Sequence, residues 1–289
     1  MDIKKLQVFL VVSKYNNFTK AGEELGYTQS GITQMMKSLE SEVGFPLFSK
    51  SHHGVSLTKE AKSLIPSIRT LLSASEALNQ EIAFRKGAKK GTINVGTFGS
   101  CATHWLPAII SNFQKKYPEI TFDITEGNEV EIADWVTNNK VDFAFTSYQK
   151  YQPYDFIPVY DDQMFAIMPK DHPFSEHEEI PIEWFQDMPF VISEYSYVND
   201  VHQLLKKHKV TPDMRYTLSN DFSILPMVEY GLGISILPGL MLRGNEDKLD
   251  IRPLVPRAYR TLGLALRSKE ELTPAAKIFL KYAQDYLLD

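Results

Sequence analysis

Several classes of protein are disfavoured by what this sequence lacks. Cys101 is the single cysteine among 289 residues, which excludes a framework of intramolecular disulfides and a zinc site built from several cysteines. No stretch approaches the roughly 20 apolar residues needed to span a bilayer, and the N-terminus has the pattern of an amphipathic helix without a cleavage site. We therefore expect a cytoplasmic protein with no membrane partner.

The motifs that carry common enzyme chemistries are also missing. The sequence has no phosphate-binding P-loop, no glycine fingerprint for a dinucleotide and no pair of cysteines. An enzyme would need such a motif, a metal cluster, or a nucleophile with its base. The sequence therefore predicts no catalytic residue, no metal site and no cofactor.

Length and charge indicate more than one domain. The chain exceeds one average domain, and its 43% hydrophobic and 23% charged residues are ordinary for a globular protein. The first 90 residues hold 13 Lys and Arg against 8 Asp and Glu, whereas the remainder holds 18 against 28. The N-terminal part is therefore the candidate for contact with nucleic acid, although most of its excess charge follows residue 58.

The first 58 residues predict a helix-turn-helix. A first helix is followed by a short second one, which we expect to begin at Thr19 as N-cap and to end at Gly26. Thr28 can cap a third helix that runs to about Glu42 and is stopped by Gly44. The two-residue turn between the second and third helices is typical of the motif.

The third helix has one apolar and one polar face. The apolar stripe consists of Ile32, Met35, Met36, Leu39 and Val43. The opposite face, with the capping residue, supplies the candidates for DNA contact Thr28, Gln29, Ser30, Thr33, Gln34 and Lys37. Glutamine amides suit adenine in the major groove and lysine suits phosphate. A merely solvated helix face explains the pattern about equally well.

A small β-hairpin, or wing, is expected after this helix. An apolar stretch over residues 45–48 and an alternating one over 55–57 flank a polar segment with a glycine. Lys50, His52 and His53 could contact the DNA backbone or the minor groove. Adjacent histidines rarely chelate one ion without further ligands nearby, so we expect no metal here.

These first residues resemble the DNA-binding signature of the LysR family of bacterial transcription regulators. The match over about sixty residues rests on Leu6, Phe9, Phe18, Thr19, Ala21, Leu25, Gln29 to Thr33, Leu39, Glu40, Gly44, Leu47, Phe48, Leu57 and Thr58. The sequence departs from the family pattern at Ser30, Thr33, Lys50 and Ala61. The resemblance implies a winged helix-turn-helix, and a dimer of dimers as the assembly.

A helix that pairs with another helix is predicted after the wing. Apolar residues recur at spacings of four and three at Leu57, Ala61, Leu64, Ile68, Leu71, Leu78 and Ile82, interrupted by Ser75. This seam could be buried within the chain, but its polar flanks favour a second copy. We expect Leu64, Ile68, Leu71, Leu78 and Ile82 to make a homodimer that reads a roughly palindromic DNA site. A hinge is expected over residues 87–91.

The remaining residues, 91–289, alternate strand-like with helix-like stretches, which favours an α/β fold with parallel strands. Helices are expected over 106–116, 130–138 and 274–288, and short strands over 92–96, 120–125, 141–145, 164–168 and 262–266. Two crossovers, near 150–162 and 240–262, would divide this part into lobes of 91–161 with 262–289, and of 162–261. This pattern resembles the two-lobed, periplasmic-binding-protein-like effector domain of the same family. The expected domains are therefore 1–58, 59–90 and 91–289.

An effector site is expected where strands end and helices begin, since helix N-termini offer free N–H groups. The candidates are Thr97, Gly99, Ser100, Cys101, Thr103, Ser147, Ser193 and Tyr195. Several hydroxyls at helix starts would suit a carboxylate or another small anion, although a surface loop rich in Ser and Thr is an equally good explanation. A redox role for Cys101 is disfavoured because no second cysteine could resolve an oxidised thiol.

The sequence thus predicts a regulator that binds specific double-stranded DNA. A small, anionic metabolite bound between the two lobes would modulate its binding to DNA or its activation of promoters, and RNA polymerase is a further candidate partner. The C-terminal part alone could be a periplasmic solute-binding protein. The N-terminal 90 residues and the missing signal peptide argue against that alternative.

Overall fold

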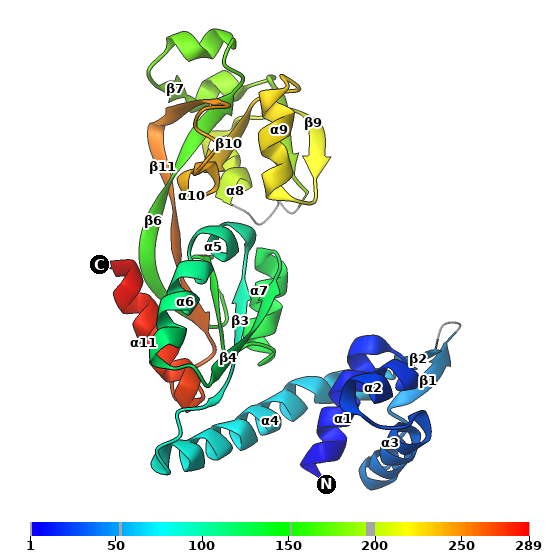
Figure 1. The fold of residues 1–289 in the computed structure, drawn as a ribbon. Coiled ribbons are helices and arrows are strands. Elements are labelled where there is room, and N and C mark those ends of the chain that lie inside the picture. The colour runs from blue at the N-terminus through cyan, green and yellow to red at the C-terminus, as the bar shows by residue number, and fades with distance from the viewer. Residues whose placement is uncertain (1, 52–53, 151, 195–199, 289) are drawn as a thin grey trace. The chain divides into compact units, whose positions relative to one another are not determined.

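The computed structural model describes residues 2–51, 54–150, 152–194 and 200–288. The chain forms two compact units, and Figure 1 shows the elements of each. One unit comprises Met1–Lys86 with Asn138–Lys140, and the other comprises Gly87–Thr137 with Val141–Asp289. In the described part of the chain, no helix is long and apolar enough to cross a membrane.

The N-terminal unit begins with the predicted helix-turn-helix. Its helices are α1 (Ile3–Tyr15), α2 (Phe18–Leu25) and α3 (Gln29–Val43). The Thr28 hydroxyl accepts a hydrogen bond from the Gly31 N–H at 3.1 Å, and Gly44 ends α3 with φ of 85°. Both predicted ends of α3 are therefore confirmed. The predicted cap of α2 was wrong: Asn17, not Thr19, caps it through its side-chain oxygen.

The wing packs on the core of this unit. Strands β1 (Phe48–Ser51) and β2 (Gly54–Leu57) pair in antiparallel fashion, as predicted. The Phe48 ring lies 5.6 Å from Phe9 and 5.4 Å from Phe18 between centroids. Buried side chains from α1 and α3, including Ile32 and Leu39, complete the core. The apolar stripe predicted for α3 thus faces the interior.

The predicted seam lies on the long helix α4 (Lys59–Arg85), where its first part is buried and its second part is exposed. Its first turns pack on the core of the N-terminal unit, where Ile68 is 7% exposed and Leu64 is partly buried. Leu71, Leu78 and Ile82 are 44%, 61% and 44% exposed. The seam prediction therefore needs correction for Leu64 and Ile68, because the core of their own chain already contacts them.

The first lobe of the C-terminal unit has the predicted parallel strands, in the order β5-β3-β4. Its elements are β3 (Gly91–Thr97), α5 (Gly99–His104), α6 (Leu106–Lys116), β4 (Ile120–Glu126), α7 (Glu129–Thr137), β5 (Phe143–Ser147) and α11 (Pro274–Leu288). The Phe279 ring lies 4.9 Å from Phe113 and 4.7 Å from Phe122 between centroids. These rings fix α6 and α11 on the sheet.

The two lobes are joined by two long strands, β6 (Asp155–Met168) and β11 (Asp250–Leu266). They form one antiparallel ladder whose register runs from Asp155 opposite Leu266 to Met168 opposite Asp250 (Figure 1). The two predicted crossovers lie in these strands: β6 contains residues 155–162 and β11 contains residues 250–262. Pro158 and Pro253 and the many exposed positions had obscured the alternation.

The second lobe packs helices around β8 and β10. Its elements are η1 (Pro173–Glu176), β7 (Ile180–Pro181), η2 (Ile182–Phe185), β8 (Pro189–Ser193), α8 (Asp200–His208), β9 (Asp213–Leu218), η3 (Asp221–Ser223), α9 (Ile224–Glu229), β10 (Ser235–Pro238) and α10 (Gly239–Leu242). β8 pairs with β9 in parallel, and β10 pairs with β6 in antiparallel fashion. The predicted α/β class and two-lobed organisation are therefore confirmed.

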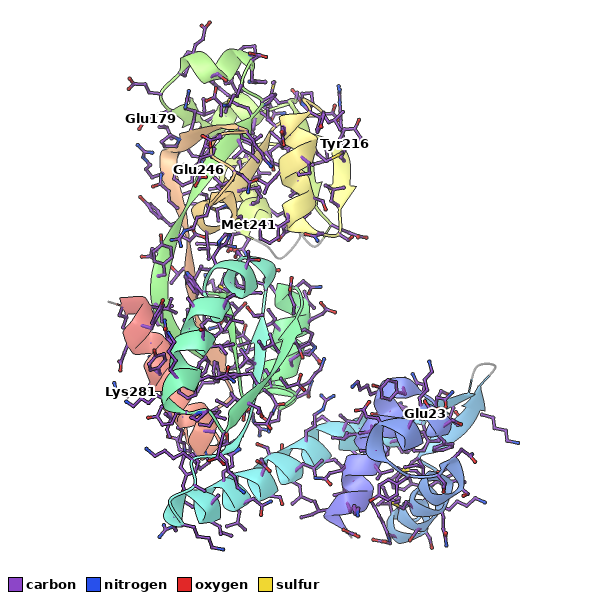
Figure 2. The ribbon with its side chains drawn as sticks, in the orientation of Figure 1. Glu23, Glu179, Tyr216, Met241, Glu246 and Lys281 are labelled. Carbon is purple, nitrogen blue, oxygen red and sulfur yellow. The ribbon has the colours of Figure 1, made fainter. Side chains whose placement is uncertain are left out.

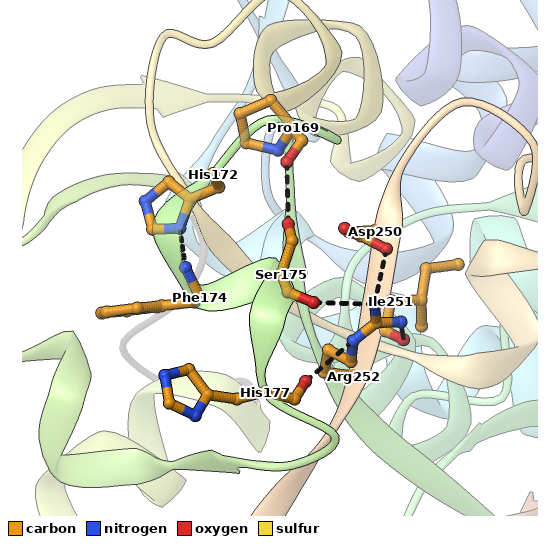
Figure 3. A network of polar contacts seen from close by, with 8 residues as sticks. All are labelled: Pro169, His172, Phe174, Ser175, His177, Asp250, Ile251 and Arg252. Carbon is orange, nitrogen blue, oxygen red and sulfur yellow. Dashed lines mark hydrogen bonds and ion pairs between the residues drawn. The ribbon is translucent and has the colours of Figure 1, made fainter.

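Arg252 connects β11 to the segment that follows β6. Its guanidinium donates to the carbonyl oxygens of His177 and Ser175 at 3.0 and 3.1 Å, and it pairs with Asp250 at 3.0 Å (Figure 3). In the same segment, the ring Nδ1 of His172 accepts a hydrogen bond from the backbone N–H of Phe174 at 3.2 Å. These contacts fix an otherwise irregular part of the second lobe on its longest strand.

Candidate DNA interface and effector site

The exposed face of α3 contains the predicted DNA contacts. Thr28, Gln29, Ser30, Gln34 and Lys37 are exposed and Thr33 is half-buried. The Thr33 hydroxyl donates to the Gln29 carbonyl at 2.9 Å and accepts from the Gln29 amide at 3.2 Å. The Thr28 hydroxyl is already hydrogen-bonded as the N-cap of α3. Gln34 and Lys37 are therefore the members of this face that are best placed to meet another molecule.

The wing and α3 border a common hollow. Gln29 from α3, Lys50 from β1 and Asn17 at the start of α2 are among its lining residues. Lys50 is exposed, and its amine could pair with a phosphate beside the N–H groups at the start of α2. His52 and His53, the other predicted wing contacts, lie outside the described residues.

The candidate effector pocket consists of two adjoining hollows between the lobes of the C-terminal unit, with volumes of about 290 and 30 Å³. Both are lined by Glu129, Ser193, Asp221 and Met241; Met241 is labelled in Figure 2. The larger hollow also reaches Gly99 and Ser100, and the smaller one reaches Asp200 and Arg260.

The structure brings together only some of the predicted effector residues. Gly99, Ser100 and Ser193 line the pocket. Thr97, Ser147 and Cys101 are fully buried within the first lobe, and Thr103 is exposed on α5. Tyr195 lies outside the described residues. The three lining residues come from opposite lobes, as expected for an interlobe site.

A buried ion pair that the sequence did not reveal lies beside the pocket. Arg260 of β11 and Asp162 of β6 are opposite each other in the ladder and are 7% and 1% exposed. The Nε and Nη2 atoms of Arg260 donate to Asp162 Oδ2 at 3.0 and 2.8 Å. The guanidinium also lies over the Phe98 ring, 5.1 Å from its centroid.

This ion pair connects segments of both lobes. Arg260 Nη2 donates to the Ser100 hydroxyl at 3.0 Å, so the predicted ligand contact on α5 is already hydrogen-bonded. Asp162 Oδ1 accepts the backbone N–H of Leu240 at 3.0 Å, at the start of α10 in the second lobe. Residues 162 and 260 are far apart in sequence, which explains why periodicity could not pair them.

The pocket is acidic. Burial raises the pKa of Glu129 to about 7; the charges of Asp200 and Asp221 act in the same direction and Arg260 in the opposite one. Burial likewise raises the pKa of Asp200, which Arg260 and the Ser147 hydroxyl oppose. None of these acids was among the residues predicted for the effector site. Glu129, Asp200 and Asp221 come from segments far apart in sequence, so no local pattern could group them.

Cys101 is a poor candidate for a redox switch. Its side chain is fully buried on α5. Burial raises the pKa of the thiol well above its ordinary value, and Arg260 only partly opposes that effect. The thiol is therefore protonated at neutral pH, and a protonated thiol is a weak nucleophile.

A winged helix-turn-helix followed by a two-lobed domain with an interlobe pocket defines a ligand-responsive DNA-binding regulator. Residues 3–62 match the family described as bacterial regulatory helix-turn-helix protein, lysR family, and residues 86–288 match the LysR substrate binding domain. The chain belongs to the LysR family of transcriptional regulators, which are not enzymes.

Individual relatives match over nearly the whole chain or over its C-terminal part. The uncharacterized HTH-type transcriptional regulator YvbU of Bacillus subtilis is 28% identical over 99% of this chain and 98% of its own. The structure of full-length CbnR with its target DNA has a TM-score of 0.67 at 16% identity and covers 99% of both chains. The effector domain of QuiR with shikimate has a TM-score of 0.61 at 22% identity and covers 68% of this chain and 97% of its own.

Proposed function

We propose that this protein reads a specific, roughly two-fold symmetric DNA site as a homodimer, and that a small molecule between its lobes modulates binding to DNA or activation of promoters. Residues 1–58 would bind DNA, 59–90 would pair the protomers, and 91–289 would sense the effector. The exposed polar face of α3, opposite an apolar face that packs into the core of the N-terminal unit, supports this assignment most directly. Such a regulator acts in the cytoplasm, where the bacterial chromosome lies.

The proposed assembly and partners follow from the same features. Exposed Leu71, Leu78 and Ile82 on α4 support pairing with a second copy. Full-length CbnR, of similar fold, has been solved with its target DNA, which supports the DNA partner. A dimer of dimers and a contact with RNA polymerase complete the proposal by analogy with the family.

Substitutions on α3 test the DNA interface. Gln34→Ala should weaken binding to a site selected from genomic fragments by about 1–3 kcal/mol while leaving binding to unrelated DNA unchanged, because an amide reads base edges. Lys37→Ala should weaken binding to both and lower the salt slope by about one phosphate contact. Fluorescence anisotropy at several salt concentrations measures both effects.

Lys206→Ala, an exposed lysine of α8, is the matched control and should leave both affinities unchanged. If Gln34→Ala and Lys37→Ala both bound the selected site as tightly as the unaltered protein, α3 would not be the reading helix.

A charge in the seam tests the pairing of protomers. Leu78→Glu should raise the dimer dissociation constant at least about tenfold, because an unpaired carboxylate would have to be buried against the partner helix. Asn79→Glu adds the same charge at the next position, which is exposed and outside the seam, and should leave the dimer intact. Analytical ultracentrifugation separates the two outcomes, and equal effects of both variants would argue against this seam.

A further inference from the structure

The described walls of the effector pocket carry an excess of negative charge. The acidic lining residues are Glu126, Glu129, Glu131, Asp200 and Asp221. Among the lining residues that the structure describes, the one basic side chain is Arg260, and it is already ion-paired with Asp162. The pocket thus offers several carboxylates whose charges no lining cation balances.

Three of these carboxylates are contributed by different segments around the smaller hollow. Glu129 begins α7 in the first lobe, whereas Asp200 begins α8 and Asp221 begins η3 in the second lobe. All three line that hollow. Like charges in a partly buried space repel, and each also loses hydration. The ionised form of this group is therefore costly, and a positive charge that entered the hollow would stabilise it.

The hydrogen bonds within the protein satisfy some of the acids but not the charge of the whole group. Glu131 accepts the backbone N–H and the side-chain amide of Asn128 at 3.0 and 2.9 Å. The carboxylate of Asp200 accepts a hydrogen bond from the Ser147 hydroxyl. These neutral donors stabilise individual carboxylates, but they add no positive charge to the pocket.

The rest of the smaller hollow is apolar. Its apolar lining side chains are Met164, Ile192, Val201, Ile224, Ile236, Leu237, Pro238 and Met241. A ligand that fits both parts would place a hydrocarbon portion on these side chains and a charged portion at the carboxylates. An inorganic ion would leave the apolar wall unused.

The acids are also arranged unlike a metal site. In the described ranges of the chain, no three His, Cys, Asp or Glu side chains come close enough together to hold a metal ion. The lining carboxylates are distributed around a cavity, which suits several N–H donors on one organic group better than a single small ion.

Building on the effector role proposed above, we propose that the effector of this protein is an organic cation: an amine or a guanidine on a small apolar body, with its N–H donors distributed among Glu129, Asp200 and Asp221. This charge is opposite to the one that the hydroxyls at the helix starts had suggested. The Ser100 hydroxyl already accepts from Arg260, and Arg260 is held by Asp162. The Ser100 hydroxyl, which the sequence predicted as a ligand contact, is therefore already engaged within the protein.

A set of probes of equal length tests the charge. The full-length protein is mixed with 1,4-diaminobutane, 4-aminobutyrate, 1,4-butanediol and succinate, and with a wider panel of amines, guanidines, sugars and carboxylates. Melting temperature and affinity for the selected DNA are measured. At least one amine or guanidine should raise the melting temperature and change DNA affinity, while carboxylates of similar size should not. The zwitterion 4-aminobutyrate shows whether a carboxylate on the same molecule is tolerated.

Variants then locate the binding. Glu129→Gln and, separately, Asp221→Asn should weaken the best amine or guanidine about tenfold or more, because each removes one charged hydrogen-bond acceptor. Glu178→Gln changes an exposed acid outside the pocket lining and should leave the affinity unchanged. Calorimetry on the full-length variants gives the dissociation constants, and their unliganded DNA binding shows that they are folded.

Each contrary outcome has a distinct meaning. Stabilisation by carboxylates but by no amine or guanidine would overturn the proposed charge while leaving an effector role intact. An amine that binds Glu129→Gln and Asp221→Asn as tightly as the unaltered protein would bind elsewhere, which also overturns the proposal. If no compound of any charge changes stability or DNA affinity, both the charge and the proposed effector role are wrong.

Discussion

Asp162→Ala is expected to lower the free energy of unfolding of the C-terminal unit by about 3–5 kcal/mol, the usual effect of removing one partner of a buried ion pair. The substitution would leave the guanidinium of Arg260 buried without its counter-charge. It would also remove the acceptor of the Leu240 N–H at the start of α10. Denaturant unfolding of the full-length protein, followed by circular dichroism, measures the loss.

Two controls separate the ion pair from other effects of the substitution. Asp161→Ala alters the neighbouring exposed residue, whose carboxylate accepts only the Thr261 hydroxyl among the hydrogen bonds described, and should cost about 0.5 kcal/mol. The double variant Asp162→Leu with Arg260→Leu removes both charges and should recover much of the stability. If Asp162→Ala and Asp161→Ala cost the same, the ion pair contributes little.

Glu129→Gln is expected to stabilise the unliganded protein at pH 8 by up to about 3 kcal/mol and to have little effect near pH 4.5. The pKa of Glu129 is about 7 in the folded protein against 4.5 ordinarily, and each pKa unit corresponds to about 1.4 kcal/mol. The folded state therefore binds more protons than the unfolded state between these values, and its stability falls as pH rises from about 4.5 to 7. Glutamine removes this loss.

The groups that face Glu129 are Asp200, Asp221, Arg260 and Tyr154. The two acids remain in Glu129→Gln, so the variant removes the titration of Glu129 alone. Unfolding free energies measured from pH 4.5 to 8 test the expectation, with Glu178→Gln as the exposed control. A variant less stable than the unaltered protein at every pH would mean that the ionised carboxylate makes a favourable contact.

The sequence predicts local structure well where signals are local. Thr28 and Gly44 locate both ends of α3 because a cap and a left-handed residue act within one turn. The bounds of α6 and α11 also agree with the predicted 106–116 and 274–288. Tertiary contacts were harder to predict. The core of the N-terminal unit covers Ile68 of the seam, and this depends on how α4 packs on that core.

Only part of the lining of the candidate effector site could be predicted from the sequence. Loops after strands identified Ser100 and Ser193 correctly as lining residues, since strand ends meet at one edge of a sheet. The charge of the site depends on residues brought together from distant segments, such as Glu129 with Asp221. Arg260 and Asp162 were missed because they belong to long strands that the sequence had suggested were crossovers.

The paired strands β6 and β11 determine how motion can pass between the lobes. Sliding one strand along the other by a single residue would break the whole ladder and turn its side chains to opposite faces. Bending of the ribbon is therefore the motion open to it, and the pair of Asp162 and Arg260 lies within the ribbon itself. The pair therefore lies in the connection between the two lobes, where a small bend would displace each lobe by an amount that grows with distance from the ribbon.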